Sequence, residues 1–426
     1  MRVDIARAAD TLSGTIDIPQ QGATRLPLRH VRSSRDSVHF ELPSMAGLAR
    51  FAGVQRGDSI TGAFQQAGVH TTFRLARGGT TATTEPEETV PYAREEVSYP
   101  NGAAVIAGTL TRPPGAGPFP AALLITGSGS QDRDETIFGF KPFKLIADHL
   151  TRHGIAVLRL DDRGIGGSTG DPTNATSEDL AGDVRTGIAY LRGRHDIDSR
   201  RIGLIGHSEG GIIAPMVAAG SRDVAFVVMM AGLGVRGDTL LLTQSALVMH
   251  AQGVSDSVIA ENQRIQRLGF KAARTGQNWE TVRAAVIEVV RRQLVAAGAA
   301  KNGVDVEEFA RTRADDQQVA LMKSPWMRFF IDYDPAPTLA RVPCPVLALF
   351  GAQDLQVPPS LNRPPVEKAL ATHRDAKVVT IPDANHLFQP TTSGNPALYG
   401  TLPREFAPGV LDTMTTWLTA RVGGAR

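Results

Sequence analysis

The sequence lacks several features that mark particular classes of protein. Cys344 is the only cysteine among 426 residues, which excludes an intramolecular disulfide and leaves no cysteine pair for a zinc site. No apolar run reaches the roughly 18 residues of a transmembrane helix. The longest run, 224–235, contains glycines and has the pattern of a buried strand. Basic and acidic residues nearly balance at 45 and 43, without a basic block, so binding to nucleic acid or to an anionic membrane is not expected.

The length and the apolar content of 42% are sufficient for one large core and a smaller one, which predicts two domains. Residues 1–78 predict a small antiparallel β-domain, because apolar and polar residues alternate over 38–42 and glycines separate short strands. Residues 79–90 form the predicted linker, since 79–88 contain no large apolar side chain. The second predicted domain spans 91–426.

From residue 91 onward, apolar runs of strand length alternate with helical patterns. The strands are expected at 121–125, 155–160, 224–230, 345–350 and 377–381, and the helices at 144–152, 178–192, 212–219, 366–371 and 408–420. Such alternation is typical of an α/β fold, in which helices cover both faces of a mostly parallel sheet. Residues 233–340 interrupt it with four helical patterns, which predict a helical lid. Trp326, Phe329 and Phe330 are candidates for the wall of a substrate pocket under this lid.

A serine lies between glycines at the end of one short apolar strand. The pattern is Gly206-x-Ser208-x-Gly210, and an apolar helix follows it directly. A strand that turns sharply into a helix forces its corner residue into a strained backbone, and small neighbours relieve the crowding. The pattern therefore predicts an exposed nucleophile, Ser208, at the positive end of a helix. A chance match in a glycine-rich turn is the alternative interpretation of this motif alone.

A nucleophilic hydroxyl needs a base, and the base needs a carboxylate that orients it. Asp354 follows the strand 345–350, and His386 follows the strand 377–381. Both therefore lie at the carboxyl ends of parallel strands, which is the edge of the sheet where ligands bind. The chain order Ser208, Asp354, His386 is the one expected for this kind of fold.

Other residues compete for these two roles. His373 is the only other histidine after Asp354, and its position favours a cation at the end of a helix. Asp375 precedes a strand, and Asp383 is too near His386 in sequence to reach its Nδ1 easily. Asp354 is preferred, although an aspartate that caps a turn would have a similar pattern.

Acyl transfer also requires N–H donors for the oxyanion. The backbone amide of Glu209 is one predicted donor. The second comes from the loop after the strand 121–125, where Ser128 is the first choice and Gly129 the second. A phosphate-binding loop is the competing interpretation, but no Gly-Lys-Ser/Thr sequence follows.

A second glycine cluster, 161–170, follows the strand 155–160. Its spacing differs from a dinucleotide-binding fingerprint, and Asp171 continues into a loop instead of opening a helix. We interpret the cluster as a structural loop beneath the site, with Arg163 as an ion-pair partner that holds it.

The motifs together resemble those of a known family. They are the segments ITGSGSQDRDE (125–135), LRLDDRGIGGSTG (158–170), GHSEGG (206–211), GAQDLQVP (351–358) and NHLF (385–388). In these segments the chain resembles bacterial serine esterases of the α/β-hydrolase superfamily, in the branch near dienelactone hydrolases and the catalytic domains of prolyl-oligopeptidase-like enzymes. The resemblance covers residues 90–420, and the β-domain is similar to one that precedes the hydrolase in related esterases.

The resemblance implies hydrolysis of small-molecule carboxylic esters through an acyl-enzyme, with Ser208, Asp354 and His386 as the triad. No metal and no organic cofactor is expected. A serine peptidase or aminoacyl-releasing enzyme with the same triad is the first alternative, and a non-catalytic binding protein on this fold is the second. The natural ester, its acyl length and its alcohol are not predicted.

The resemblance also gives expectations about the rest of the protein. The β-domain is expected to pack against the hydrolase or to form a homodimer, with sugar or substrate binding as the alternative. The first seven residues carry charge without an apolar stretch, so no signal peptide is expected in this chain. Relatives of this type are often exported, and the chain starts inside its first domain by comparison with them; a missing leader would explain both.

Overall fold

The structure is a computed structural model that describes residues 2–8, 11–18, 23–44, 47–66, 69–77, 89–296 and 305–423. Of the predicted linker 79–90, only residues 89 and 90 are among them. The chain divides into two compact units. Unit 1 is Met1–Thr89 with Thr275–Met322, and unit 2 is Val90–Arg274 with Lys323–Arg426.

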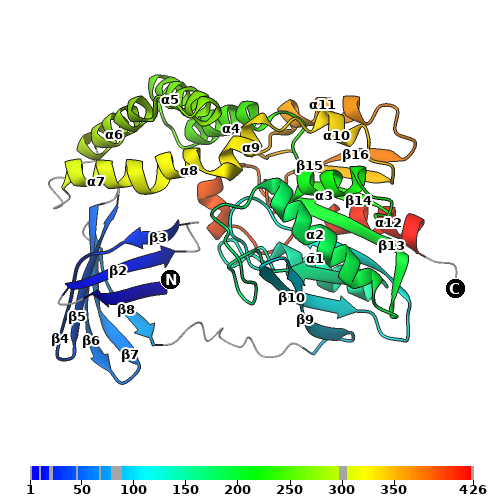
Figure 1. The fold of residues 1–426 in the computed structure, drawn as a ribbon, viewed down its shortest axis with the longest axis horizontal. Coiled ribbons are helices and arrows are strands. Elements are labelled where there is room, and N and C mark those ends of the chain that lie inside the picture. Colours follow the sequence, from blue (N-terminus) through cyan, green and yellow to red (C-terminus); the bar gives the residue numbers. More distant parts are fainter. Residues whose placement is uncertain are drawn as a thin grey trace. The chain divides into compact units, whose positions relative to one another are not determined.

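Unit 1 contains two antiparallel sheets, which confirms the predicted all-β character of the N-terminal region (Figure 1). One sheet has the order β1-β2-β3 and the other the order β4-β5-β6-β7-β8. The strands are β1 (Arg2–Ala8), β2 (Thr11–Ile18), β3 (Ala23–Pro27), β4 (Arg29–Ser34), β5 (Ser37–Ser44), β6 (Gly47–Arg56), β7 (Ser59–Gln66) and β8 (Val69–Ala76). Phe40 and Phe51 stack at 4.7 Å between ring centroids, and Phe73 meets Phe51 edge to face at 5.3 Å. The alternation seen in 38–42 therefore places Phe40 in a small aromatic core.

Unit 1 also includes helices from the predicted insertion. They are α6 (Trp279–Ala296), α7 (Val306–Arg313), the π-helix η3 (Ala314–Val319) and most of α8 (Ala320–Lys323). The buried residues of α6 are Val282, Val286, Val290 and Leu294, which recur every four residues and so share one face of the helix. An ion pair joins Arg29 to Glu308 within this unit. Residues 275–322 thus group with the N-terminal strands, whereas 233–274 and 323–340 group with unit 2.

Unit 2 is built on an eight-stranded sheet with the order β16-β15-β14-β13-β11-β12-β10-β9. Its strands are β9 (Ala93–Asn101), β10 (Ala104–Arg112), β11 (Phe119–Ile125), β12 (Ala156–Leu160), β13 (Ile197–His207), β14 (Val227–Met230), β15 (Val346–Gly351) and β16 (Ala376–Ile381). Neighbours from β12 to β16 pair in parallel, and β9 and β10 add an antiparallel edge. Strands β12, β14 and β15 are buried along their whole length, as their continuous apolar runs require. The predicted α/β fold class is confirmed.

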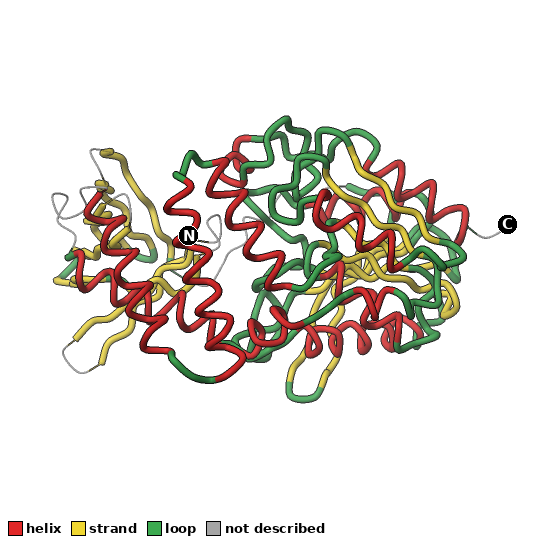
Figure 2. Tube along the Cα trace, turned by 90° about the horizontal axis from the view of Figure 1, so that it is seen from above, coloured by secondary structure: helices red, strands yellow, loops and turns green. Residues whose placement is uncertain are grey.

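Helices lie on both sides of this sheet (Figure 2). Their bounds are α1 (Pro142–Arg152), α2 (Ser177–Arg192), α3 (Gly210–Ala219), α4 (Gly237–Ala251), α5 (Asp256–Thr275), α9 (Pro325–Asp332), α10 (Ala336–Leu339), α11 (Pro359–Ala369), α12 (Val410–Val422) and the 3₁₀ helix η4 (Pro396–Thr401). Helix α1 packs on β10 and β12 and touches α12, whereas α2 and α3 touch each other and pack on β13. The strand ends that carry the predicted site residues are held between these layers.

One helix differs from its predicted bounds by more than two residues at one end. The sequence predicted only 366–371, but α11 begins at Pro359 and includes Pro364 and Pro365. A proline inside a helix lacks the N–H for a backbone hydrogen bond, which is why this stretch has weak helical character in sequence. Packing of the buried Val366 and Asn362 in unit 2 outweighs that local preference.

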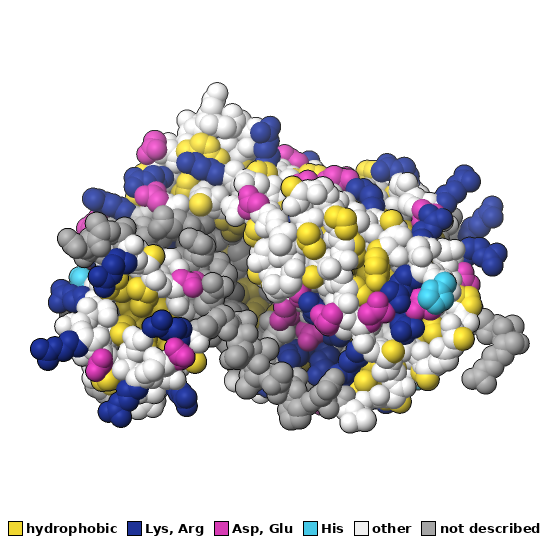
Figure 3. Space-filling view, turned by 60° about the horizontal axis from the view of Figure 1, so that its bottom comes forward, with side chains coloured by type: hydrophobic (Ala, Val, Ile, Leu, Met, Phe, Trp, Pro, Cys, Tyr) yellow, Lys and Arg dark blue, Asp and Glu magenta, His cyan; other side chains and the backbone are white. Residues whose placement is uncertain are grey.

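Figure 3 shows acidic and basic side chains interspersed over the face that it draws, in agreement with the balanced composition. Within the described ranges, no helix combines the length and the apolar character that crossing a bilayer requires.

Candidate active site

Ser208 occupies the corner between β13 and α3. Its φ angle is +54°, in the left-handed region that non-glycine residues rarely adopt. The Ser208 N–H donates to the Met230 carbonyl at 2.8 Å, and the Ser208 carbonyl accepts from the Gly211 N–H at 2.9 Å. These bonds fix the strained corner to the neighbouring strand and to the first turn of α3.

The glycines of the motif are required by close backbone approaches. A Cβ added at Gly206 would lie 1.9 Å from the Gly210 carbonyl oxygen. One added at Gly210 would lie 2.2 Å from the Ile125 carbonyl oxygen. Any side chain at these positions would therefore push α3 away from the ends of β11 and β13. Packing therefore requires glycine at both positions of the motif, which a chance match in a turn would not explain.

Asp354 and His386 are brought together from loops 32 residues apart in sequence. His386 Nδ1 lies 2.8 Å from Asp354 Oδ2. The other carboxylate oxygen, Oδ1, accepts the backbone N–H groups of Gln356 at 2.7 Å and Val357 at 2.8 Å. Both side chains are buried, with exposed fractions of 2% for Asp354 and 6% for His386. The backbone therefore holds Asp354 Oδ1, which leaves Oδ2 facing the Nδ1 of His386.

The competing residues have other partners. Asp375 forms an ion pair with Arg421, with 2.9 Å between Arg421 Nε and Asp375 Oδ2. His373 donates from Nε2 to the Val342 carbonyl at 3.1 Å and accepts the Asp375 N–H on Nδ1. Asp383 is exposed. None of the three contacts His386, so the geometry favours Asp354 as its partner.

His386 also lies next to the end of β13, which leads into Ser208. His207, the residue before Ser208, donates from Nε2 to the His386 carbonyl at 2.9 Å, and the two imidazole rings are 4.8 Å apart between centroids. Among the residues that the structure describes, the His386 side chain is hydrogen-bonded to that of Asp354 but not to that of Ser208. Catalytic hydrogen bonds in ligand-free proteins are often long and shorten only when substrate binds. The structure thus joins two of the three predicted triad members directly and the third through its neighbour.

The loop after β11 passes close to Ser208. A Cβ added at Gly127 would lie 3.2 Å from Ser208 Cβ. The Gly127 N–H donates to Glu135 Oε1 at 2.7 Å, so this amide is already engaged. Ser128 is the next residue and is exposed, and Gly129 adopts a φ of +95°. Beyond Gly127, whose amide is engaged by Glu135, the next amide of this loop is that of Ser128.

Glu209, the second predicted donor residue, begins α3 with its backbone in the helical region. Its side chain is 1% exposed, and Oε1 accepts from Ser177 Oγ at 2.5 Å and from Trp326 Nε1 at 2.8 Å. Burial raises the pKa of this carboxyl above its ordinary value. The Trp326 ring stacks on Phe330 at 4.8 Å. Trp326, predicted as a pocket wall, thus binds the residue that follows Ser208.

The second glycine cluster forms a loop without a helix N-terminus. Arg163 donates from Nε to Asp183 Oδ2 at 2.7 Å and from Nη2 to Asp183 Oδ1 at 2.9 Å, which confirms it as an ion-pair partner. Asp162, in the same loop, accepts from Thr126 Oγ1 and from the Gln131 N–H, both at 2.8 Å. The loop thus supports the segment that carries Ser128.

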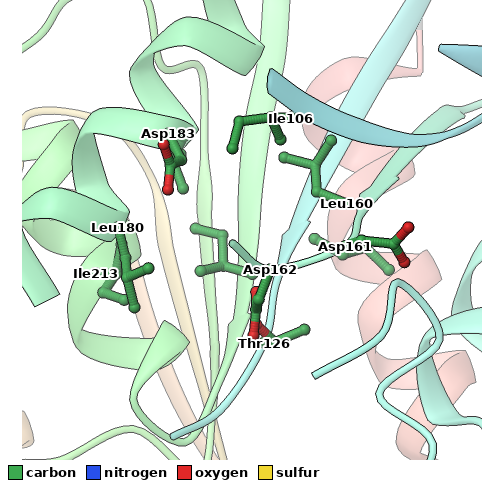
Figure 4. Close-up of a pocket in the computed structure, with 11 residues that line it drawn as sticks. Ile106, Thr126, Leu160, Asp161, Asp162, Leu180, Asp183 and Ile213 are labelled. Atoms are coloured by element: carbon green, nitrogen blue, oxygen red, sulfur yellow. The ribbon is translucent and has the colours of Figure 1, made fainter. Parts of the chain in front are cut away.

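Figure 4 shows a small pocket beside these residues, with Thr126 and Asp162 on one side and Leu180 and Ile213 on the other. Burial raises the pKa of Asp162 to about 8, against the opposing hydrogen bonds from Gln131 and Thr126 and with a further contribution from the charges of Glu135 and Glu209. None of the three predicted triad side chains lines this pocket. It lies behind the loop and is not the predicted ester site.

Sequence reasoning missed two buried residues next to the site. Glu135 and His207 are 1% and 4% exposed, and His207 Nδ1 lies 2.8 Å from Glu135 Oε1. Both belong to motifs that the sequence displays, at the end of 125–135 and directly before Ser208. Only their adjacency in space distinguishes them from ordinary polar loop residues.

Comparison with known proteins agrees with this architecture. The family model described as the alpha/beta hydrolase family matches residues 114–393, well over half of the chain. The chain belongs to the α/β-hydrolase family. The predicted resemblance to this superfamily is thereby confirmed.

One curated relative of this α/β hydrolase is Esterase EstD from Thermotoga maritima. It is 28% identical over 281 residues, which are 66% of this chain and 57% of that protein. The match therefore spans little more than half of the relative's length.

Several solved structures are also similar. The α/β hydrolase GrgF from Penicillium has a TM-score of 0.47 and 16% identity over 78% of this chain and 100% of its own. An esterase from Pyrococcus furiosus has a TM-score of 0.47 and 13% identity over 78% and 92%. A dienelactone hydrolase from Anabaena variabilis has a TM-score of 0.42 and 17% identity over 78% and 99%.

Proposed function

We propose that this α/β hydrolase is a serine carboxylesterase with Ser208 as nucleophile, His386 as general base and Asp354 as the carboxylate that orients it. The observation that carries the proposal is the bond between His386 Nδ1 and the buried Asp354, at the same edge of the sheet as the strained Ser208 corner. With Nδ1 protonated, the Nε2 of His386 is free of its proton and is the atom that takes one from a hydroxyl. The name of the Thermotoga relative supports esters as the substrate class.

In the proposed reaction, Ser208 Oγ attacks the ester carbonyl carbon while its proton passes to His386 Nε2. The backbone N–H groups of Ser128 and Glu209 stabilise the negative charge on the carbonyl oxygen, aided by the N-terminal end of α3. His386 then gives the proton to the departing alcohol, and Ser208 stays acylated. Water repeats the sequence and releases the acid. Asp354 takes no proton in this scheme and orients the ring, since its two oxygens accept from the backbone and from His386 Nδ1.

The domain assignment is part of the same proposal. We assign 1–78 to a β-domain, 79–90 to a linker and 91–426 to the hydrolase, with the insertion 233–340 as a helical lid. Trp326 supports a role for the insertion at the site, since it reaches Glu209 from α9. Helices α4 and α9 pack on each other within unit 2. Their apolar faces would exclude water from the acyl-enzyme.

The test combines activity with covalent labelling. Ser208→Ala should lower the turnover of p-nitrophenyl butyrate by roughly 10⁴-fold or more, because triad members act as a unit. A fluorophosphonate probe should label the wild-type protein and not the variant. Ser257→Ala, which changes an exposed serine of α5 in the same way, should leave both signals unchanged. Retained turnover in folded Ser208→Ala protein would remove Ser208 from the mechanism.

A panel of esters from acetyl to decanoyl, run beside peptide amides, defines the substrate class. Faster turnover of esters is expected. Turnover of aminoacyl amides above that of every ester would instead identify a peptidase with the same triad.

A further inference from the structure

A second buried histidine and carboxylate lie directly beside the proposed triad. The His207 ring is bonded at both nitrogens, by Nδ1 to Glu135 Oε1 at 2.8 Å and by Nε2 to the His386 carbonyl oxygen at 2.9 Å. The same Glu135 oxygen accepts the Gly127 N–H at 2.7 Å. Two side chains therefore connect three segments of the site: the loop after β11, the end of β13 and the loop after β16.

We propose that Glu135 and His207 form a buried carboxylate–imidazolium pair that positions the main chain of His386 and the Gly127 loop relative to Ser208. The proposal rests on the proposed esterase function, and neither residue touches the substrate in it. Both are positioning residues. The pair would fix the position of the base relative to the oxyanion donors, although these groups lie on segments that are far apart in sequence.

The protonation of the ring follows from its partners. A carbonyl oxygen only accepts, so Nε2 of His207 carries a proton. The contact between Nδ1 and Glu135 Oε1 requires one further proton, which is shared between an imidazole and a carboxylate. Imidazole is the more basic of the two by about 2 pH units in model compounds, so the proton resides on the ring. His207 is then an imidazolium whose Nδ1 donates to Glu135 Oε1.

The charges around the ring agree with this assignment. Burial lowers the pKa of His207, but the adjacent Glu135 charge, the two hydrogen bonds and the more distant charge of Asp354 raise it above its ordinary value. The other neighbours are the His386 ring, at 4.8 Å, and the uncharged Phe388 ring, at 6.5 Å between centroids. Glu135 Oε2 is buried without a hydrogen-bond partner among the described residues, so the contact of Oε1 with the ring is what compensates this carboxyl group.

The pair also explains which loop amide is available to the oxyanion. Because Glu135 Oε1 accepts the Gly127 N–H, this amide is already engaged, and the next amide along the chain is that of Ser128. A substitution that releases Gly127 would let the loop rotate. A displacement of about 1 Å in such a group costs roughly 10²-fold in rate.

The first experiment counts the ring protons directly. In protein labelled with ¹⁵N-histidine, His207 should show both ring N–H signals at pH 7, assigned through the contact of its Nδ1 proton with the Gly127 amide proton. A ring with one N–H at pH 7 would overturn the imidazolium. The measurement uses the unaltered protein, so it does not depend on any variant that fails to fold.

The second experiment separates positioning from folding. Glu135→Gln should reduce kcat roughly 10- to 100-fold while KM changes less than about threefold, since the reacting groups are misaligned but the pocket is kept. Glu367→Gln makes the same chemical change at an exposed residue of α11 and should match the wild type. Unchanged kcat in folded Glu135→Gln protein, or a change confined to KM, would overturn the positioning role.

Failure of this inference is distinguishable from failure of the proposed function. The same labelling experiment on Ser208→Ala protein reports the His207 protons in the absence of turnover. If the Ser208→Ala protein shows two protons on the His207 ring and keeps full activity, Ser208 is not the nucleophile but the ion pair stands. One ring proton, together with lost activity, would keep the esterase and remove the pair.

Discussion

Replacing Asp354 by asparagine tests the orientation of His386 with almost no change in shape. Asp354 Oδ1 accepts two backbone N–H groups, from Gln356 and Val357. An asparagine must keep its oxygen there, because turning its NH₂ group toward two donors would lose both bonds. Its NH₂ group therefore faces His386 Nδ1, which lies 2.8 Å from the present Oδ2. The ring then accepts on Nδ1 and carries its proton on Nε2, where it no longer serves as a base for Ser208.

The size of the effect follows from the bonds at stake. To react, the Asp354→Asn variant must restore the proton to Nδ1, which sets two donors against each other in a site where Asp354 is 2% exposed. Loss of a charged hydrogen bond costs about 1.5–3 kcal/mol, and leaving a buried donor unsatisfied costs about 1–3 kcal/mol. At about 1.4 kcal/mol per tenfold in rate, the sum predicts a fall in kcat of roughly 10²- to 10⁴-fold. The same substitution in serine proteases lies at the upper end of this range.

The assay is hydrolysis of p-nitrophenyl butyrate, with thermal unfolding measured on the same samples. Asp383→Asn is the matched control, because Asp383 is exposed, lies three residues before His386 and has a φ of +50°, which asparagine tolerates. The control should retain wild-type kcat. Suppose that the Asp354→Asn protein unfolds at the wild-type temperature and keeps more than about half of the wild-type kcat. Asp354 would then not be the residue that keeps the His386 proton on Nδ1, and its proposed role would be wrong.

Two further predictions concern stability. The pKa of Asp162 is raised to about 8 in the folded protein, whereas an unfolded aspartate has a pKa near 4. Between these two values the folded state binds more protons than the unfolded state. The protein's free energy of unfolding therefore falls as the pH rises from about 4 to about 8. Asp162→Asn keeps both hydrogen bonds, because Thr126 Oγ1 can also accept one from the asparagine NH₂ group. In urea unfolding, this variant should lose less free energy of unfolding between pH 5 and pH 8 than the wild type. An equal loss would contradict the raised pKa of Asp162. Gly210→Ala should lower the free energy of unfolding by roughly 1–3 kcal/mol, because its Cβ would lie 2.2 Å from the Ile125 carbonyl oxygen. Gly182→Ala, within α2 with open space around the added Cβ, should instead raise it by about 0.4–1 kcal/mol, and equal effects of the two changes would refute the packing argument.

The regular elements of unit 2 were largely predictable because each has a strong local signal. Strands such as β12 and β15 are buried on both faces, which requires continuous apolar runs. The internal prolines concealed the first part of α11. The grouping of 275–322 with the N-terminal strands has no local signal at all, because it depends on contacts between segments about 200 residues apart.

The candidate site divides in the same way. The strained corner at Ser208 was readable because close backbone approaches leave room only for glycine at 206 and 210, and those glycines are visible in the sequence. The positions of Asp354 and His386 after two strands followed from the rule that parallel strands end at one edge. Glu135 and His207 had no comparable signal, since a glutamate in a loop and a histidine before a serine are ordinary residues.

The sequence by itself determined the fold class and three candidate catalytic residues, because periodicity and glycine spacing are local properties of the chain. Only the tertiary structure decided that Asp354 rather than Asp375 or Asp383 meets the ring of His386 and that His207 is bonded at both nitrogens. The physical reason is that a hydrogen bond depends on distance and direction in space. Distance and direction depend on how the whole chain folds, and neither is encoded at a single position of the sequence.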